Sequence, residues 1–131
     1  PDFELQTSVA REALPKEIAY RDAVFNLSRA ALMRVSLYSG KYENLRVAAD
    51  DRLHQPYRLA LIPGAEKAVA MAYELGAYAA YISGAGSTIM AVIGDGNTSF
   101  ENEAAKQLRY LGLEKWSVNS HSIDNCGALV F

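Results

Sequence analysis

The sequence of 131 residues contains a single cysteine, Cys126, which excludes an internal disulfide and is typical of a reducing, cytoplasmic compartment. It lacks any apolar run long enough for a transmembrane helix and any recognisable signal peptide. Thirteen basic and fifteen acidic side chains nearly balance, and the formal net charge of −2 argues against a nucleic-acid-binding or membrane-binding surface. We expect Cys126 to be a small packed residue in a turn, with no nucleophilic role.

Half of the residues are apolar and 21% are charged, which suits one domain over residues 1–131 with a hydrophobic core. No internal repeat or low-complexity linker divides the chain. It begins at Pro1 without a methionine and leads almost at once into a strand-like stretch. We therefore expect a fragment of a longer protein.

Hydrophobic periodicity and turn residues predict the order strand, helices, two strands, helix, two strands. This order predicts an α+β fold: a ferredoxin-like antiparallel sheet with an expanded helical insert after the first strand. The predicted elements are a strand at 3–7, a short helix at 8–14, a long helix at 16–39 capped by Gly40, further helix at 41–54, a break at Pro56 and Pro63, a helix at about 65–75, strands at 77–83 and 87–93, a helix from a Thr98–Glu101 capping box to Gly112, and strands at 116–123 and 128–131.

Three polar residues of the long helix, Asp22, Asn26 and Arg29, stand at i, i+4 and i+7 among apolar neighbours. At about 100° per residue they fall within one stripe of roughly 60°. Such a stripe either faces solvent or lines a cleft, where a guanidinium would hold a carboxylate in a two-pronged fork. The pattern alone leaves both interpretations open.

The stretch DDRLHQPYR at 50–58 gathers charged, polar and aromatic side chains. Arg52 and Arg58 either bind an anionic ligand or pair with the two aspartates that open the stretch. His54 is either a hydrogen-bonded structural group or a general base, and His121 has no partner that suggests a role. No spacing of His, Cys or carboxylate residues predicts a metal site.

The glycine-bearing stretch SGAGST at 83–88 stands between two predicted strands. It is not a Walker loop, because no Gly-Lys-Ser/Thr follows, and the dinucleotide fingerprint would need a helix where a strand follows here. A hairpin turn is one interpretation. The other is a loop whose glycines let the backbone approach an anion closely.

Five stretches together resemble a known family. They closely resemble the C-terminal domain of the bacterial homoserine kinases, which belong to the GHMP small-molecule kinase superfamily. SGAGST alone would indicate only the superfamily, whereas DAVFNLSRAAL with DRLHQPYR and LIPG is specific to the family. In order, the stretches are AREALP (10–15), RDAVFNLSRAAL (21–32), DRLHQPYR (51–58), LIPG (61–64) and SGAGST (83–88).

The resemblance implies the substrate-side half of an enzyme that transfers the γ-phosphoryl group of ATP to the hydroxyl of L-homoserine in threonine biosynthesis. In this family ATP and Mg²⁺ bind mainly to an N-terminal domain with a Gly-Ser-rich phosphate loop. No such loop occurs here, so we expect that domain to be absent and this chain to be inactive alone. The resemblance also implies contact with the protein's own N-terminal domain, a homodimer and a cytoplasmic location.

The resemblance assigns substrate binding to the long helix and to the 50–58 stretch. Arg29 corresponds to the arginine that contacts the homoserine carboxylate, and Asp22 and Asn26 then line the cleft beside it. Arg58 is a candidate for a second contact to the same carboxylate. No residue of the chain is assigned as catalytic or as a metal ligand.

The resemblance also places SGAGST at the active site. Ser83, Gly84, Ala85 and Gly86 are expected to line the site near the substrate and the phosphate, in addition to turning the hairpin. The family usually has proline where this chain has Ser87, so the backbone geometry of the loop is left open.

Three other functions fit parts of the sequence. A related kinase of mevalonate, galactose or a similar metabolite would share SGAGST but would not need the other stretches. A stand-alone amino-acid-binding regulatory module is a second alternative, since ferredoxin-like domains often serve that role. A structural dimerisation domain is the third.

Overall fold

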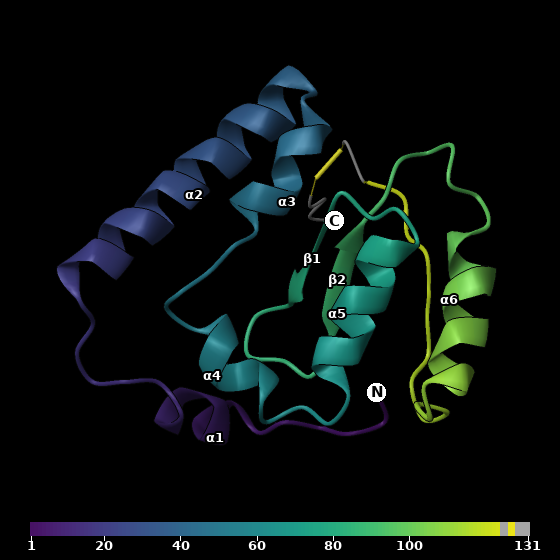
Figure 1. Ribbon diagram of the computed structural model, residues 1–131, viewed down its shortest axis with the longest axis horizontal. Helices are drawn as coiled ribbons and strands as arrows, with labels where there is room; N and C mark the ends of the chain where they lie inside the picture. Colours follow the sequence, from purple (N-terminus) through teal and green to yellow (C-terminus); the bar gives the residue numbers. More distant parts are fainter. Residues whose placement is uncertain (124–125, 128–131) are drawn as a thin grey trace.

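The computed structural model describes residues 1–123 and 126–127. Figure 1 shows a central hairpin, with helices α5 and α6 on one side of the view and the long helix α2 on the other. No helix of the described part is both long and apolar enough to cross a membrane. In chain order the elements are α1 (Thr7–Glu12), α2 (Tyr20–Ser39), the 3₁₀ turn η1 (Tyr42–Asn44), α3 (Leu45–Ala48), α4 (Gln55–Leu59), α5 (Ala65–Glu74), β1 (Ala79–Ile82), β2 (Ile89–Val92) and α6 (Phe100–Tyr110).

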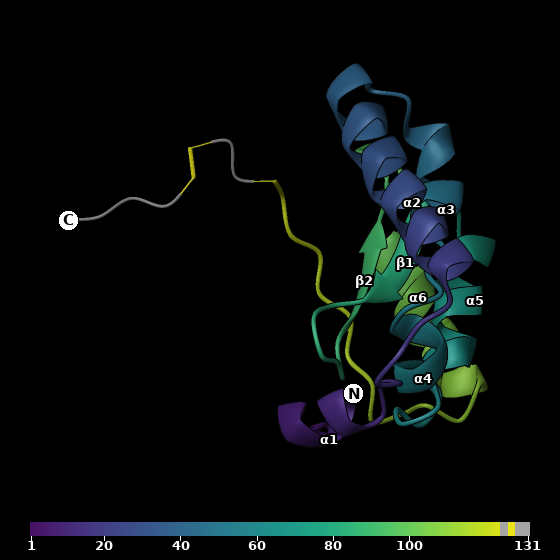
Figure 2. The same ribbon diagram turned by 90° about the vertical axis from the view of Figure 1, so that its left-hand side faces the viewer.

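The described sheet is an antiparallel hairpin of β1 and β2, with Ala79 opposite Val92 and Ile82 opposite Ile89. It confirms the hairpin predicted around the glycine loop. Helix α5 packs on both strands, and α6 packs on α5. Figure 2 shows the two helices on the same side of the hairpin. The architecture is α+β, as predicted.

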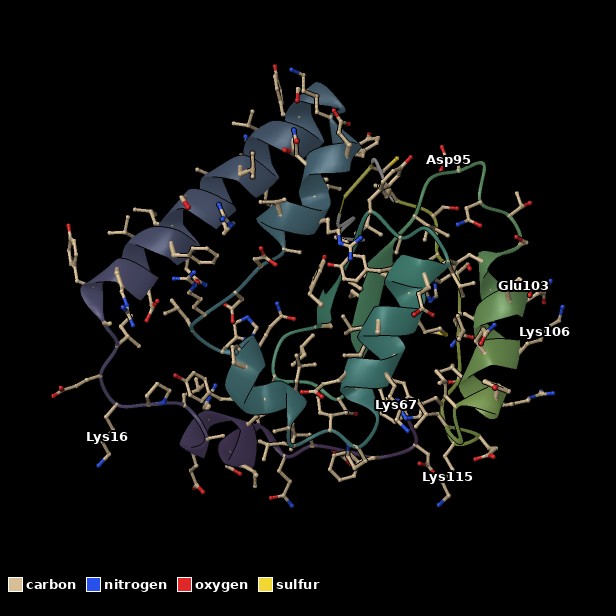
Figure 3. All side chains as sticks on the ribbon, viewed as in Figure 1. Lys16, Lys67, Asp95, Glu103, Lys106 and Lys115 are labelled. Carbon is tan, nitrogen blue, oxygen red and sulfur yellow. The ribbon has the colours of Figure 1, made fainter. Side chains whose placement is uncertain are left out.

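The core of the described residues consists of two apolar clusters, and the α5 and α6 members of the larger one recur every three or four residues. The larger joins α5 to α6, and the smaller lies where residues 5–10 meet the start of α5 and the end of β1. On the opposite side of α6, Glu103 and Lys106 point away from α5 (Figure 3), with their charged atoms 2.7 Å apart. The buried residues are Ala68, Met71, Ala72, Ala77, Ala80, Phe100, Ala104 and Leu108 in the first cluster and Leu5, Ala10, Ile62, Ala65 and Ile82 in the second.

The predicted strand at 3–7 is wrong. Its alternation is real, but Leu5 is the only one of these five residues that is buried, and helix α1 already begins at Thr7. The backbone near it pairs with loops, because Asp2 donates to the carbonyl of Lys115 at 2.9 Å. An alternating pattern needs a neighbouring strand to become a strand, and none of the described residues supplies one here.

Of the last predicted pair of strands, the first is not found and the second is outside the described residues. Residues 116–123 have no regular structure, and residues 128–131 lie outside the described part. Trp116 and Val118 pack individually on the larger core cluster. The backbone N–H of Ser120 donates to the carboxylate of Glu101 at 3.0 Å. Its partner is therefore a side chain and not the carbonyl of a neighbouring strand.

Helix boundaries differ from the sequence pattern in two places. The long helix begins at Tyr20 instead of 16, and the predicted helix at 41–54 is reduced to η1 and α3. Pro56 does not break the chain but lies in the first turn of α4, where a missing N–H costs nothing. Gly40 ends α2 with φ +69°, which confirms the predicted cap.

Two smaller predictions also fail. Helix α6 begins at Phe100 with Ser99 as the N-cap residue and no side-chain cap hydrogen bond, so the Thr98–Glu101 capping box is not formed. Cys126 is exposed, not packed.

Candidate functional site

A groove of about 230 Å³ lies between the inner side of α2, the loop before α4 and the end of β1. It brings together residues distant in the sequence, because the loop after α3 carries the chain back across α2. Two of the residues that the sequence predicts for substrate binding, Asn26 and Arg29, line it. The other lining residues are Ala30, Met33, Ala48, Ala49, Asp50, Asp51, His54, Gln55, Tyr81 and Ile82.

Arg29 lines this groove and has a hydrogen-bond donor without a partner among the described residues. Its Nε atom is buried and has no hydrogen-bond partner among the described residues. Its guanidinium carbon lies 4.2 Å from the centroid of the Phe25 ring, a distance typical of a cation–π contact. A buried N–H group without a partner costs free energy, which a ligand oxygen would recover. The groove thus offers an oriented guanidinium to an anion.

His54 contributes a second unused polar atom at the same groove. Its Nδ1 is buried without a partner in the described residues, and its Nε2 lies 3.9 Å from Oδ1 of Asp51. Its backbone N–H donates to Asp51 at 2.7 Å. His54 therefore has a structural role through its backbone, in line with the interpretation as a hydrogen-bonded structural group. Its side chain also lines the groove.

Asn26 and Asp22, the other members of the stripe, hold the loop before α4. The Asn26 amide donates from Nδ2 to Oδ1 of Asp51 and accepts the backbone N–H of Arg52 at 2.9 Å. Asp22 accepts from Nη1 of Arg52 at 3.2 Å. The guanidinium carbon of Arg52 also lies 3.8 Å from the centroid of the Phe25 ring. Arg52 therefore pairs with α2 and not with its aspartate neighbours.

Asp51 is the most buried charge of the site, with a side chain only 7% exposed. Its Oδ2 accepts the backbone N–H groups of His54 at 2.7 Å and Gln55 at 2.6 Å, at the start of α4. Burial raises the pKa of this carboxyl, but the hydrogen bonds from Gln55, His54 and the Asn26 amide, with the nearby His54 ring, outweigh burial. The net pKa of Asp51 is therefore lowered from 3.8.

This lowered pKa predicts a specific acid dependence of folding. The stabilisation by Asp51 is fully present above the pKa of the unfolded chain, about 3.9, and is lost as the pH falls through the lower folded pKa. Asp51→Ala should therefore lower the free energy of unfolding near neutral pH, with the difference from wild type shrinking below about pH 4. Urea unfolding followed by Trp116 fluorescence at several pH values measures this. A difference that stays constant into strong acid would contradict it.

Arg58 lies outside the groove and ties three segments together. Its Nε donates to the carbonyl of Ala10 in α1, and its Nη1 donates to the carbonyl of Gly84, each at 3.1 Å. Both contacts are to backbone oxygens, which hold α4 against α1 and the glycine loop. Its expected contact with a substrate carboxylate remains a prediction.

The loop of Ser83, Gly84, Ala85 and Gly86 forms the predicted hairpin turn. The N–H of Ser83 donates to the carbonyl of Thr88 at 2.8 Å, and the N–H of Gly86 donates to the carbonyl of Ser83 at 3.0 Å. The loop directly follows the end of β1 that lines the groove, although its four residues do not line the groove themselves. Its role near phosphate remains a prediction.

Two residues that build the site, Gln55 and Asp51, were not among the site residues predicted from the sequence. The Gln55 side chain accepts the N–H of Ile82 in β1 and donates to the carbonyl of Ala49, each at 3.1 Å. Asp51 was treated only as a possible partner of arginine. Asp51 precedes the N-cap residue His54 by three positions, so the usual capping pattern, with the aspartate immediately before the helix, does not indicate this role.

A larger cavity of about 410 Å³ lies between α5, α6, β2 and residues 116–121. Its walls are mainly core side chains such as Met71, Phe100 and Leu108. Thr88 of the SGAGST stretch lines it, whereas the predicted site residues Asp22, Asn26, Arg29, Arg58 and 83–86 do not. The groove beside α2 is therefore the candidate site.

Comparison with known proteins identifies the class of protein to which this fold and groove belong. Residues 33–112 match the family model described as GHMP kinases C terminal, so the chain belongs to that family. Over 99% of its length it is 51% identical to a homoserine kinase of Clostridium beijerinckii, and over all of it 47% identical to one of Caldicellulosiruptor saccharolyticus. The chain spans 43% of the length of each of these relatives.

A solved structure supports the same assignment. The chain superimposes on the homoserine kinase of Cytophaga hutchinsonii with a TM-score of 0.74 and 27% sequence identity. The match covers 83% of this chain and 35% of that protein. These findings confirm the resemblance to the C-terminal part of homoserine kinases.

Proposed function

We propose that this chain is the substrate-side part of a homoserine kinase, in which the groove beside α2 holds the amino acid. The observation that carries the proposal is the buried, unpartnered Nε of Arg29 in a groove of about 230 Å³. The similarity to homoserine kinases over nearly the whole chain indicates which anion would occupy it. A guanidinium binds a carboxylate with two parallel hydrogen bonds, which fixes the orientation as well as the position of the ligand.

In this proposal the chain contributes positioning to phosphoryl transfer. Arg29 holds the carboxylate of L-homoserine so that its side-chain hydroxyl points toward the phosphate donor. The hydroxyl oxygen forms the new bond to the γ-phosphorus, the bond to the β-phosphate oxygen breaks, and the hydroxyl proton is released. Because alignment supplies much of the acceleration in such reactions, a fixed substrate is a direct contribution to the rate.

ATP and Mg²⁺ enter the proposal through the rest of the enzyme. The GHMP kinase family implies ATP as the phosphate donor. Within residues 1–123 and 126–127, no group of three or more His, Cys, Asp or Glu side chains is placed to hold a metal ion. On the ground of the family resemblance, the proposal places the binding of Mg²⁺, with that of ATP, mainly in an N-terminal domain and assigns no residue of this chain to magnesium. A homodimer, a cytoplasmic location and a role in threonine biosynthesis belong to the same proposal.

The proposal predicts that the complete protein consumes ATP in the presence of L-homoserine and that residues 1–131 alone do not. The reason is that the groove supplies the acceptor but not the phosphate donor. ADP release should be measured with homoserine, galactose and mevalonate as acceptors, and the phosphorylated product should be identified by mass spectrometry. Activity of the complete protein with galactose or mevalonate but not homoserine would contradict the proposal. Homoserine-dependent ATP consumption by the isolated chain would contradict the division of labour.

A further inference from the structure

Helix α2 is held to the rest of the molecule at two places. Near its C-terminal end it packs on η1 and α3, where Ser36 is buried. Toward its N-terminal end it runs away from α3 and β1 in Figure 1. There the side chains of Asp22 and Asn26 bond to residues 51–52, and the guanidinium of Arg52 lies over the Phe25 ring. Arg29 lies between the two places, one turn beyond Asn26.

The side-chain amide of Asn26 binds the loop before α4 through both of its polar ends, in one orientation. Its NH₂ group donates to the carboxylate, and its carbonyl oxygen accepts the N–H of Arg52. Both ends of the amide are therefore committed to residues 51–52. The half-buried amide is costly to reorient, because a flip would set its NH₂ group against the N–H of Arg52 and its oxygen against the carboxylate of Asp51.

The second oxygen of Asp51 extends this contact through α4 to the other side of the site. It caps the N-terminus of α4, and Gln55 joins the same helix to β1. At the far end of α4, Arg58 donates to the carbonyl of Gly84 in the glycine loop. A continuous set of contacts thus connects the helix that carries Arg29 with the loop after β1.

We propose that Asn26 and Asp51 are a positioning pair, which fixes Arg29 over the groove by bracing α2 against α4, and that neither contacts the substrate. The pair replaces the substrate-binding role that the family resemblance suggested for Asn26. Its effect on homoserine rests on the proposed function, whereas its effect on the placement of α2 does not. The carboxylate supplies acceptors on both sides, toward α2 and toward α4, which no neutral side chain of the same size does.

An exchange of the two side chains tests the pair in the complete protein. Asp51→Asn puts an amide donor against the NH₂ of Asn26, and Asn26→Asp puts two carboxylates against each other, so each single variant should lose the brace. The double variant Asn26→Asp/Asp51→Asn restores every hydrogen bond with the direction of the central one reversed. It also restores the net charge.

We expect each single variant to raise the homoserine KM by about tenfold or more while the ATP KM changes little, because the loss falls on the placement of Arg29. The double variant should return to within about threefold of wild type. If the folded double variant remains as defective as the single variants, the side chains have roles of their own and the positioning pair is excluded. Equal kinetics of all four proteins would exclude it as well.

The position of α2 provides a readout that does not depend on activity. Spin labels at Tyr20→Cys in α2 and Tyr110→Cys in α6 occupy exposed sites at opposite edges of the molecule. With Cys126 and any cysteine outside this chain replaced, their distance distribution should broaden in Asp51→Asn and narrow again in the double variant. Asp50→Asn, which removes an exposed carboxylate one residue away, should leave the distribution unchanged.

The two readouts separate the failures of the two proposals. If the distribution responds as expected but the wild-type protein shows no dependence on homoserine, the brace stands and the proposed function fails. If homoserine is phosphorylated but the distribution and the homoserine KM are the same in wild type and Asp51→Asn, the proposed function stands and the positioning pair fails.

Discussion

Replacement of Arg29 by alanine is expected to lower kcat/KM for homoserine in the complete protein by about 30- to 1,000-fold, which corresponds to about 2–4 kcal/mol. The size follows from the site, because the guanidinium is partly buried and its Nε has no partner among the described residues. A carboxylate bound there would lose a charge-assisted pair with a half-buried guanidinium. The ATP KM should change little, because the loss is confined to the acceptor.

Two further variants show whether the effect belongs to the guanidinium at this position. Arg34→Ala removes an exposed arginine of the same helix and should leave homoserine kinetics unchanged. Arg29→Lys keeps the charge but not the planar fork, so its loss should lie between those of wild type and Arg29→Ala. Steady-state kinetics with homoserine varied at saturating ATP measures all three. An unchanged homoserine dependence in Arg29→Ala would return Arg29 to a structural role.

Gly86→Ala is expected to lower the free energy of unfolding by about 2–4 kcal/mol, because two costs add. Gly86 has φ +97°, a conformation that residues with a side chain rarely adopt. A Cβ atom there would also lie 2.7 Å from Cδ1 of Ile62 and 3.4 Å from Cδ2 of Leu5, both in the smaller core cluster. The substitution therefore strains the backbone of the turn and also creates a steric clash with the smaller core cluster.

Gly84→Ala is the matched control for this effect. Gly84 also has positive φ, at +59°, but a Cβ atom built on it would meet nothing within 4 Å. Gly84→Ala should therefore lower the free energy of unfolding by only about 1 kcal/mol, the cost of the left-handed backbone conformation. Urea unfolding of the two variants beside wild type separates the terms, and equal losses would show that the contact with Ile62 is relieved without cost.

The hairpin and the helices around it were predictable because their signals are local. Short apolar runs on either side of Gly84 and Gly86 form β1 and β2, and Gly40 ends α2 where the pattern placed the cap. The strands predicted at 3–7 and 116–123 do not form, because alternation alone does not determine a strand. A strand depends on a partner, and the partners that these segments find are loops and the carboxylate of Glu101.

The candidate site was predictable only in part, for a related reason. The spacing of Asp22, Asn26 and Arg29 showed that one face of α2 was polar, but it did not show which of these groups would be consumed by internal bonds. That depends on the loop at 50–54, which reaches α2 only in the folded chain. Arg29 kept an unused donor, while Asn26 and Asp22 became contacts to that loop.

Titration of the complete protein with L-homoserine, followed by NMR of the arginine Nε–H groups, tests the central claim most directly. The Arg29 resonance is assigned by its loss in Arg29→Lys. The account predicts that this resonance shifts on saturation with homoserine and exchanges more slowly with water, since its Nε–H gains the partner that it lacks in the structure. A resonance that does not move while homoserine is being phosphorylated would place the substrate elsewhere and contradict the account.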